Sequence, residues 1–167
     1  MTQPRKSCKE VKGLTFAAPC LRPSFIPLQR SRKGSKGAGL RYEKLVAKAI
    51  PGSILGQWFH YLDASGPGWC QPDILVLGAK RILVLECKLT LTAEAFRQLS
   101  KLYVPVLTLA YPGRTIVPGV VCKNLTPEVD LSSVVESLPE LLSRPQGSAL
   151  PVLHWLGNSP LAGPTKR

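Results

Sequence analysis

The hydrophobic and polar positions change their period along the chain. Between Leu40 and Ile50 apolar residues recur at helical spacing among charged ones, and Pro51-Gly52 follows, which predicts an amphipathic helix. Residues 54–62 are rich in β-branched and aromatic side chains and predict one strand, which a Gly- and Pro-containing loop at 63–68 would end. The central part of the chain therefore begins as helix followed by strand.

The pattern after this loop predicts a hairpin and then a mixture of helices and strands. Two apolar runs, Asp73–Leu77 and Ile82–Leu89, flank the polar residues 78–81 and predict the hairpin. Four further elements are expected: a helix capped by Thr92 and running to about Val104, a buried strand at Val106–Ala110, a strand at Val120–Asn124, and a helix at Leu131–Leu142 interrupted by Pro139. Helices and strands in this order predict a mixed α/β domain.

The length and composition fit one globular domain with an added arm. The chain has 167 residues, of which 44% are hydrophobic and 19% charged, and this excludes wholesale disorder. Five cysteines without a C-x-x-C pair indicate neither a disulfide framework nor a zinc ribbon, so reduced intracellular thiols are expected. The longest uncharged stretch, between Arg144 and Lys166, contains four prolines and cannot cross a bilayer as a helix, so we expect no membrane association.

The charge is unevenly distributed. The formal net charge is +12, which favours a polyanionic partner, and residues 1–41 hold ten basic residues against the single acid Glu10. This arm contains four prolines and no sustained period, so it is expected to be mostly irregular. It is either a solvated tail or a segment that follows a phosphate backbone. The candidate phosphate contacts are Arg30, Arg32, Lys33, Lys36 and Arg41.

The register of the expected hairpin brings two acids and a lysine together. If Gly78 pairs with Arg81 around a two-residue turn, Asp73 lies opposite Glu86. Opposed residues share a face of the sheet, and so do residues two apart, which adds Lys88 to the same patch. Cys87 points to the other face and is expected to fill the core.

Charges in so apolar a setting are costly unless they are paired or bind a metal. One explanation is an ion pair between Lys88 and one acid at a sheet edge. The other is that Asp73 and Glu86 hold Mg²⁺, which commonly binds one or two carboxylates and keeps waters for substrate phosphates. Lys88 would then position the attacking water or stabilise the transition state, because action as a base would require its pKa to fall well below about 10.4.

At these residues the sequence resembles the PD-(D/E)XK nuclease superfamily. Pro72-Asp73, a short hairpin and Glu86-Cys87-Lys88 match its central motif, and Glu43 stands where members place a glutamate on the first core helix. Gln98 and Tyr103 match a helix found after the lysine in several branches, with a spacing one residue longer than in the helicase-associated exonucleases. The resemblance covers roughly residues 36–111 and is closest to small phage-encoded or junction-resolving members.

The resemblance implies an α/β fold with a restriction-endonuclease-like core, in which helices flank a central mixed β-sheet. It also implies that Asp73, Glu86 and the Cys87 backbone carbonyl bind Mg²⁺, for which Mn²⁺ would substitute. Lys88 would orient the water, Glu43 would hold a second metal or a metal-bound water, and Gln98 would support the site. The expected organisation is an N-terminal arm at 1–35, the nuclease core at 36–145 and a Pro-rich tail at 146–167.

The function expected from these observations is Mg²⁺-dependent DNA endonuclease activity. A structure-specific enzyme of the Holliday-junction-resolvase type, acting on branched DNA as a homodimer, is the first interpretation, because no helix-turn-helix or zinc module is present to read bases. A sequence-specific restriction-type endonuclease is the second. A non-catalytic nucleic-acid-binding protein and a basic ribosome-associated protein are the competing classes. We expect a cytoplasmic location, in the host cell if the protein is phage-encoded.

The remaining aromatic and histidine residues carry weaker signals. His60 and His154 lie far apart without Cys or Asp neighbours, which favours structural roles over a zinc site. Trp58, Phe59 and Tyr61 lie on an expected strand, and we assign them to the core and the sheet surface in preference to the alternative, base-stacking platforms.

Overall fold

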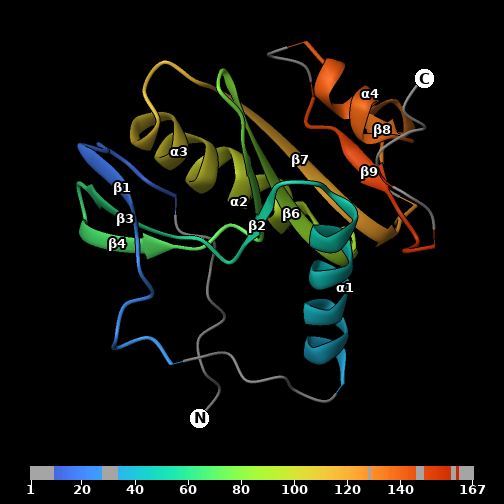
Figure 1. Cartoon of the computed structure of the whole chain (residues 1–167), viewed down its shortest axis with the longest axis horizontal. Coiled ribbons are helices and arrows are strands. Elements are labelled where there is room, and N and C mark those ends of the chain that lie inside the picture. The colour runs from blue at the N-terminus through green and yellow to red at the C-terminus, as the bar shows by residue number, and fades with distance from the viewer. Residues whose placement is uncertain (1–9, 28–33, 128, 146–148, 159–160, 162–167) are drawn as a thin grey trace.

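The computed structural model describes residues 10–27, 34–127, 129–145, 149–158 and 161. They form a mixed α/β structure with two sheets, as Figure 1 shows. The larger sheet has the strand order β2-β5-β6-β7-β9-β8, and the smaller has the order β1-β3-β4. No helix in these ranges has the length and apolar character needed to cross a membrane.

The strands of the larger sheet are β2 (Ser53–Leu55), β5 (Ile74–Leu77), β6 (Arg81–Thr90), β7 (Thr115–Asn124), β8 (Val134–Val135) and β9 (Val152–His154). Those of the smaller sheet are β1 (Phe16–Cys20), β3 (Trp58–Asp63) and β4 (Gly66–Cys70). The helical elements are α1 (Ser35–Ala49), α2 (Ala93–Gln98), the π-helical turn η1 (Leu99–Tyr103), α3 (Val104–Ala110), the 3₁₀ turn η2 (Leu131–Ser133) and α4 (Leu138–Ser143).

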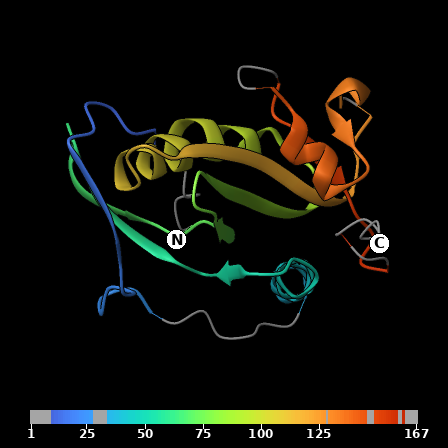
Figure 2. The same cartoon turned by 45° about the horizontal axis from the view of Figure 1, so that its top comes forward.

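Strand β6 forms the centre of the larger sheet because its side chains are apolar on both faces. It pairs antiparallel with β5 and parallel with β7, and the connection to β7 runs through α2, η1 and α3. Ile82 and Val84 join the core beneath this connection, whereas Leu83, Leu85 and Cys87 join the core beneath α1 and α4. Figure 2 shows α1 on one side of the sheet and the α2–α3 segment on the other. This layering confirms the expected mixed sheet flanked by helices.

The single strand expected at 54–62 is wrong. The chain turns at Gly56, whose φ of 73° favours glycine, and the segment divides into β2 and β3, which belong to different sheets. The loop expected at 63–68 is also shorter than predicted, because β4 begins at Gly66. Periodicity alone could not show this change of sheet, since both halves are rich in strand-forming residues.

The strand expected at Val106–Ala110 is wrong as well, since these residues belong to α3. A short apolar run suits a buried strand or a buried helix equally, and here it continues the helix that begins at Ala93. The helix expected at 131–142 consists instead of η2, β8 and the short helix α4, with Pro139 in the first turn of α4. The strand expected at 120–124 is confirmed as the second half of β7.

The terminal segments contribute strands to both sheets. Within the expected arm, β1 pairs with β3 from Phe16 to Cys20. Within the expected tail, β9 lies between β7 and β8. Both segments are therefore integrated into the fold where the structure describes them.

Candidate functional site

The hairpin of β5 and β6 has the register predicted from its turn. Leu77 pairs with Ile82 and Ile74 with Leu85, and the Gly78 N–H donates to the Arg81 carbonyl at 2.8 Å. Asp73, which immediately precedes β5, therefore lies opposite Glu86. The convergence of these carboxyl groups with Lys88 is confirmed.

Glu86 is the most deeply buried acid of this group, with 2% of its side chain exposed. Its Oε1 accepts a hydrogen bond from Lys88 Nζ at 2.8 Å, while Oε2 is buried and has no hydrogen-bond partner among the described residues. Burial, followed by the nearby charge of Asp73, raises the pKa of Glu86 to about 8. A buried oxygen without a partner is costly, so the position favours binding of a proton or a cation.

Asp73 and Glu43 extend the acidic group. The Asp73 Oδ2 accepts a hydrogen bond from the Cys87 N–H at 2.7 Å, but burial outweighs this bond and raises the pKa of Asp73. Glu43 reaches the same end of the sheet from α1, and burial together with the charge of Asp73 raises its pKa to about 7. Burial raises the pKa of all three carboxyl groups, so a positive charge nearby would stabilise their ionised forms.

Lys88 is half-buried beside these acids. Burial alone lowers the pKa of Lys88, but the charges of Glu86, Asp73 and Glu43 outweigh burial, and the pKa is raised. Lys88 therefore remains protonated at neutral pH. A charged lysine suits the positioning and electrostatic roles expected for it and does not suit the role of a general base.

Cys87 presents its side chain to the core and its backbone N–H to Asp73. Its side chain is buried in the core beneath α1, as expected for a core residue. Its N–H faces Asp73, and because the N–H and C=O of one strand residue point to the same side, its carbonyl faces this edge too. Continuing the register places Pro72 opposite Cys87, and proline has no N–H to donate to that carbonyl. We therefore expect the Cys87 carbonyl on the same side of β6 as Asp73.

Gln98 supports the site through Tyr103. The Gln98 Nε2 donates to the Tyr103 hydroxyl at 2.6 Å, and this hydroxyl donates to the Gln71 carbonyl at 3.1 Å. Gln71 lies two residues before Asp73, so the helix holds the segment that presents the first carboxylate. The π-helical turn η1 makes this contact because it places residues five apart on one face, where an α-helix would place residues four apart.

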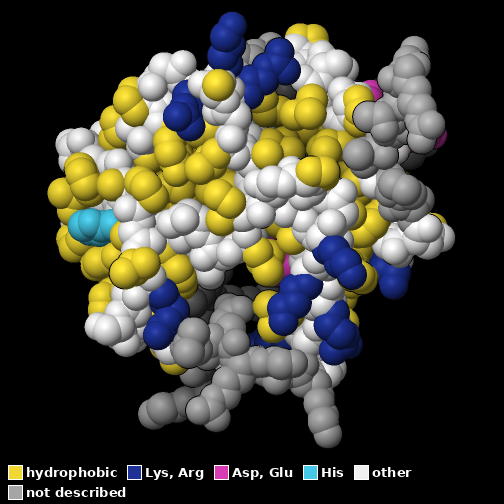
Figure 3. Space-filling model, in the orientation of Figure 1, with side chains coloured by type: hydrophobic (Ala, Val, Ile, Leu, Met, Phe, Trp, Pro, Cys, Tyr) yellow, Lys and Arg dark blue, Asp and Glu magenta, His cyan; other side chains and the backbone are white. Residues whose placement is uncertain are grey.

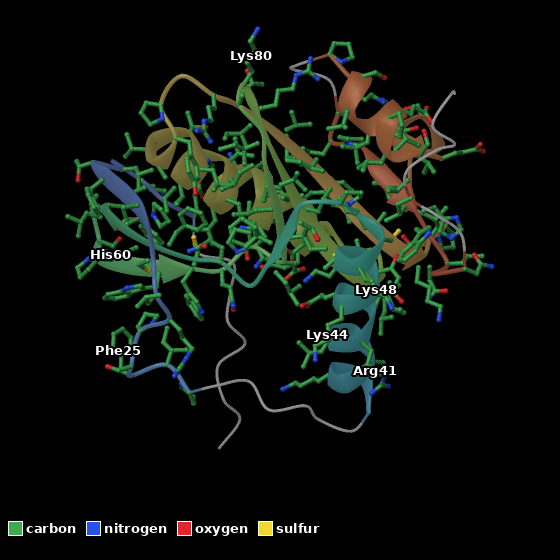
Figure 4. The ribbon with its side chains drawn as sticks, in the orientation of Figure 1. Phe25, Arg41, Lys44, Lys48, His60 and Lys80 are labelled. Atoms are coloured by element: carbon green, nitrogen blue, oxygen red, sulfur yellow. The ribbon has the colours of Figure 1, made fainter. Side chains whose placement is uncertain are left out.

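The expected phosphate contacts are only partly described. Lys36 and Arg41 are exposed on α1, whereas Arg30, Arg32 and Lys33 lie outside the described residues. Sequence reasoning missed Lys44 and Lys48, which share an exposed face of α1 with Arg41 because their spacing is three and four residues. The helical pattern itself contained this signal. Figure 3 shows Lys and Arg side chains gathered over α1, and Figure 4 labels these three residues.

Asp73 and Glu86 provide carboxylate oxygens of the kind that a hard cation binds. Within the described residues, no three or more His, Cys, Asp or Glu side chains form a group that could hold one together. A cation at this place would depend on Asp73 and Glu86, with the Cys87 carbonyl and water completing the shell. Mg²⁺ commonly binds with only one or two carboxylates, and in the part of the chain that the structure describes Glu86 Oε2 has no hydrogen-bond partner, so the donor set fits.

Comparisons of this chain with protein-family models, with curated proteins and with solved structures found no match.

Proposed function

We propose that this protein is a Mg²⁺-dependent DNA endonuclease of the PD-(D/E)XK type. The observation that carries the proposal is Glu86, a buried carboxylate within β6 whose Oε2 has no hydrogen-bond partner among the described residues. A simple ion pair with Lys88 explains why Oε1 of Glu86 is buried. It does not explain why Oε2 is buried too, or why the carboxyl groups of Asp73 and Glu43 lie nearby. A site built for a hard cation gives a reason for all of them.

The roles follow from charge and position. Asp73, Glu86 and the Cys87 carbonyl would hold Mg²⁺, which supplies a more acidic bound water and neutralises charge that develops on the phosphate. Lys88, kept protonated by its acidic neighbours, would orient the attacking water and stabilise the transition state. Glu43 would bind a second metal or a metal-bound water from α1. Gln98 and Tyr103 would keep the Asp73 segment in place.

Branched DNA is the proposed substrate, with two copies of the chain acting together. The exposed basic face of α1 suits phosphates, and phosphate contacts carry no sequence information directly. A branch presents phosphates at angles that a linear duplex does not. A C₂ homodimer supplies two equivalent centres for paired cuts. We further propose that the protein acts in the cytoplasm.

The test is a cleavage panel with linear, nicked, flapped and four-way DNA of matched sequence, with Mg²⁺, with Mn²⁺ and with EDTA. The parent should cut four-way DNA with either metal and not in EDTA. Glu86→Gln preserves the side-chain shape and should abolish cutting while leaving binding intact. Glu136→Gln, an exposed acid on another part of the chain, is the matched control and should cut normally.

Two other results would each favour a different function. Cutting of linear duplex at one short sequence would favour the restriction-type enzyme. Binding without cleavage under all metal conditions would favour a non-catalytic nucleic-acid-binding protein, in which Lys88 and Glu86 form only an ion pair.

A further inference from the structure

The smaller sheet has one buried and one exposed face. Phe59, Tyr61 and Cys70 point into the core. For Phe59 and Tyr61 this agrees with the assignment made from the sequence. Because side chains alternate along a strand, Phe16, His60 and Trp69 share the opposite face. Figure 3 shows a histidine among hydrophobic side chains on this part of the surface.

The aromatic rings on the exposed face form a continuous row. His60 stacks on Trp69 with ring centroids 4.8 Å apart and an angle of 19° between the planes. Phe16 meets His60 edge to face at 5.8 Å, and Phe25, from the segment after β1, meets Trp69 edge to face at 5.0 Å. Figure 4 labels His60 and Phe25 on this side of the molecule. We call these four residues the aromatic row.

The row is open to solvent where its two phenylalanines lie. Phe25 is 67% exposed and Phe16 is 43% exposed. Exposed aromatic surface in a contiguous patch marks an interaction site in soluble proteins. The Nε2 of His60 is buried without a hydrogen-bond partner in the described part of the chain, which costs stability that a leucine would not cost. Folding alone therefore does not account for these ring types.

The charge around the row favours a nucleic acid as its partner. The described segment from Val11 to Ile26, which carries both phenylalanines, contains the basic residues Lys12 and Arg22 and no acidic residue. Arg22 lies on the segment that carries Phe25, and its guanidinium donates to the Ile26 carbonyl. The only acid in β3 and β4, Asp63, is buried and accepts the Ser65 N–H, on the face opposite the row. A positively charged surface with stackable rings is what unpaired bases bind.

We propose that the aromatic row binds unpaired nucleotides, whose bases stack on Phe16, His60, Trp69 and Phe25. The inference rests on the proposed function and deepens it, because it makes a single-stranded segment of the branched DNA part of the substrate. Branched DNA exposes such segments where its helices separate. Stacking on aromatic side chains tolerates any base, in agreement with the absence of a base-reading module.

Binding is measured by fluorescence anisotropy in EDTA, where cleavage plays no part. The probes are labelled oligo(dT) of roughly 15 nucleotides, within the site size of single-strand binding surfaces, and a blunt duplex of the same length. Phe25→Ala and Phe16→Ala should each weaken oligo(dT) binding by about five- to one-hundredfold and change duplex binding by less than about twofold. Leu77→Ala is the control: it removes from the β5–β6 hairpin a side chain that is 42% exposed, about as much as Phe16. It should change neither oligo(dT) binding nor duplex binding.

Trp69 distinguishes stacking from a structural role. Trp69→Ala should lose oligo(dT) affinity, and Trp69→Phe should recover most of it, because a phenyl ring still stacks. Thermal melting of every variant shows whether the fold survives. Unchanged oligo(dT) binding by folded Phe25→Ala, Phe16→Ala and Trp69→Ala proteins would overturn the inference.

Two outcomes separate this inference from others. If the same substitutions changed the mass of the protein in solution and left oligo(dT) binding unchanged, the row would be a contact between two copies and the inference would be wrong. If the parent bound oligo(dT) through the aromatic row and cut no DNA with Mg²⁺, nucleotide binding by the row would be confirmed and the nuclease proposal would be wrong.

Discussion

Gln98 and Tyr103 are five residues apart and yet share a hydrogen bond of 2.6 Å. In a regular α-helix these side chains would point about 140° apart, since each residue turns by 100°. The π-helical turn η1 inserts one residue and brings them to one face. The spacing that is one residue longer than in the helicase-associated exonucleases thus has a structural explanation, and the two side chains meet beside the segment that carries Asp73.

The first prediction concerns this inserted residue. Deleting the exposed Ser100 should convert η1 to α-helix and leave Gln98 and Tyr103 four residues apart, still in contact. The protein should fold, with its melting temperature lowered by only a few degrees. Deleting the exposed Lys44 from the uninterrupted helix α1 should lower it far more, because the deletion turns Tyr42 by about 100° relative to Val46 and Ile50, with which it shares the core. Equal losses for the two deletions would contradict this interpretation.

The second prediction concerns pH in the absence of metal. The folded-state pKa values of Glu86 and Glu43, about 8 and about 7, lie above the ordinary value of 4.5. Carboxyl groups with raised pKa values stabilise the fold at low pH, and this stability is lost as the pH rises from about 4.5 to about 8. Thermal melting in EDTA should therefore show a falling midpoint between pH 5 and pH 8. Glu86→Gln should flatten this dependence.

A bound metal ion should offset the loss of stability at high pH, because it replaces the protons on the same carboxylates. Mg²⁺ should raise the melting temperature more at pH 8 than at pH 5, where protons compete with it. Two results would rule out a link between proton and metal binding at these carboxylates. One is a melting temperature in EDTA that does not change with pH. The other is an increase in melting temperature with Mg²⁺ that is the same at both pH values and in Glu86→Gln.

The third prediction separates the role of Lys88 from metal binding. Lys88→Met removes the charge and keeps most of the side-chain length. If Lys88 acts in the transition state, cleavage at saturating Mg²⁺ should fall by about 10²–10³-fold. The Mg²⁺ concentration for half-maximal rate should change less than tenfold, since the ligands remain. A loss of metal affinity with an unchanged maximal rate would instead give Lys88 a role in building the metal site.

The fourth prediction concerns the basic face of α1. Arg41, Lys44 and Lys48 are exposed and lie on one face, so each can contact a phosphate. Replacing each by Gln should reduce the slope of log affinity against log salt for duplex DNA by about 0.9 per lost contact. Lys80→Gln, an exposed lysine at the tip of the β5–β6 hairpin, is the control, and Figure 4 shows it at the other end of the molecule from this face.

The charges of the N-terminal arm are best tested by substitution, not by deletion. Deletion through residue 35 would remove β1, which pairs with β3, and would disturb the smaller sheet as well as the charge. Replacing Arg30, Arg32 and Lys33 by Gln keeps β1 and should lower the salt slope by a similar amount per contact. An unchanged slope would show that these residues do not contact phosphates.

The hairpin and the placement of Asp73, Glu86 and Lys88 follow from the local sequence pattern. Strand period and turn length are local properties, and together they define which residues face each other. The basic character of residues 1–41 is equally local. These features were readable because each depends on residues a few positions apart or directly paired across a short turn.

Features that join distant segments depend on how the folded chain packs. The break at Gly56 sends β2 and β3 to different sheets, and the apolar run at 106–110 becomes helix because it continues α2 and η1 over the larger sheet. The aromatic row depends on three strands and the segment after β1. The pKa of Glu86 depends on burial that exists only after β6 is covered. Packing between distant segments sets all of these, and local periodicity carries no information about it.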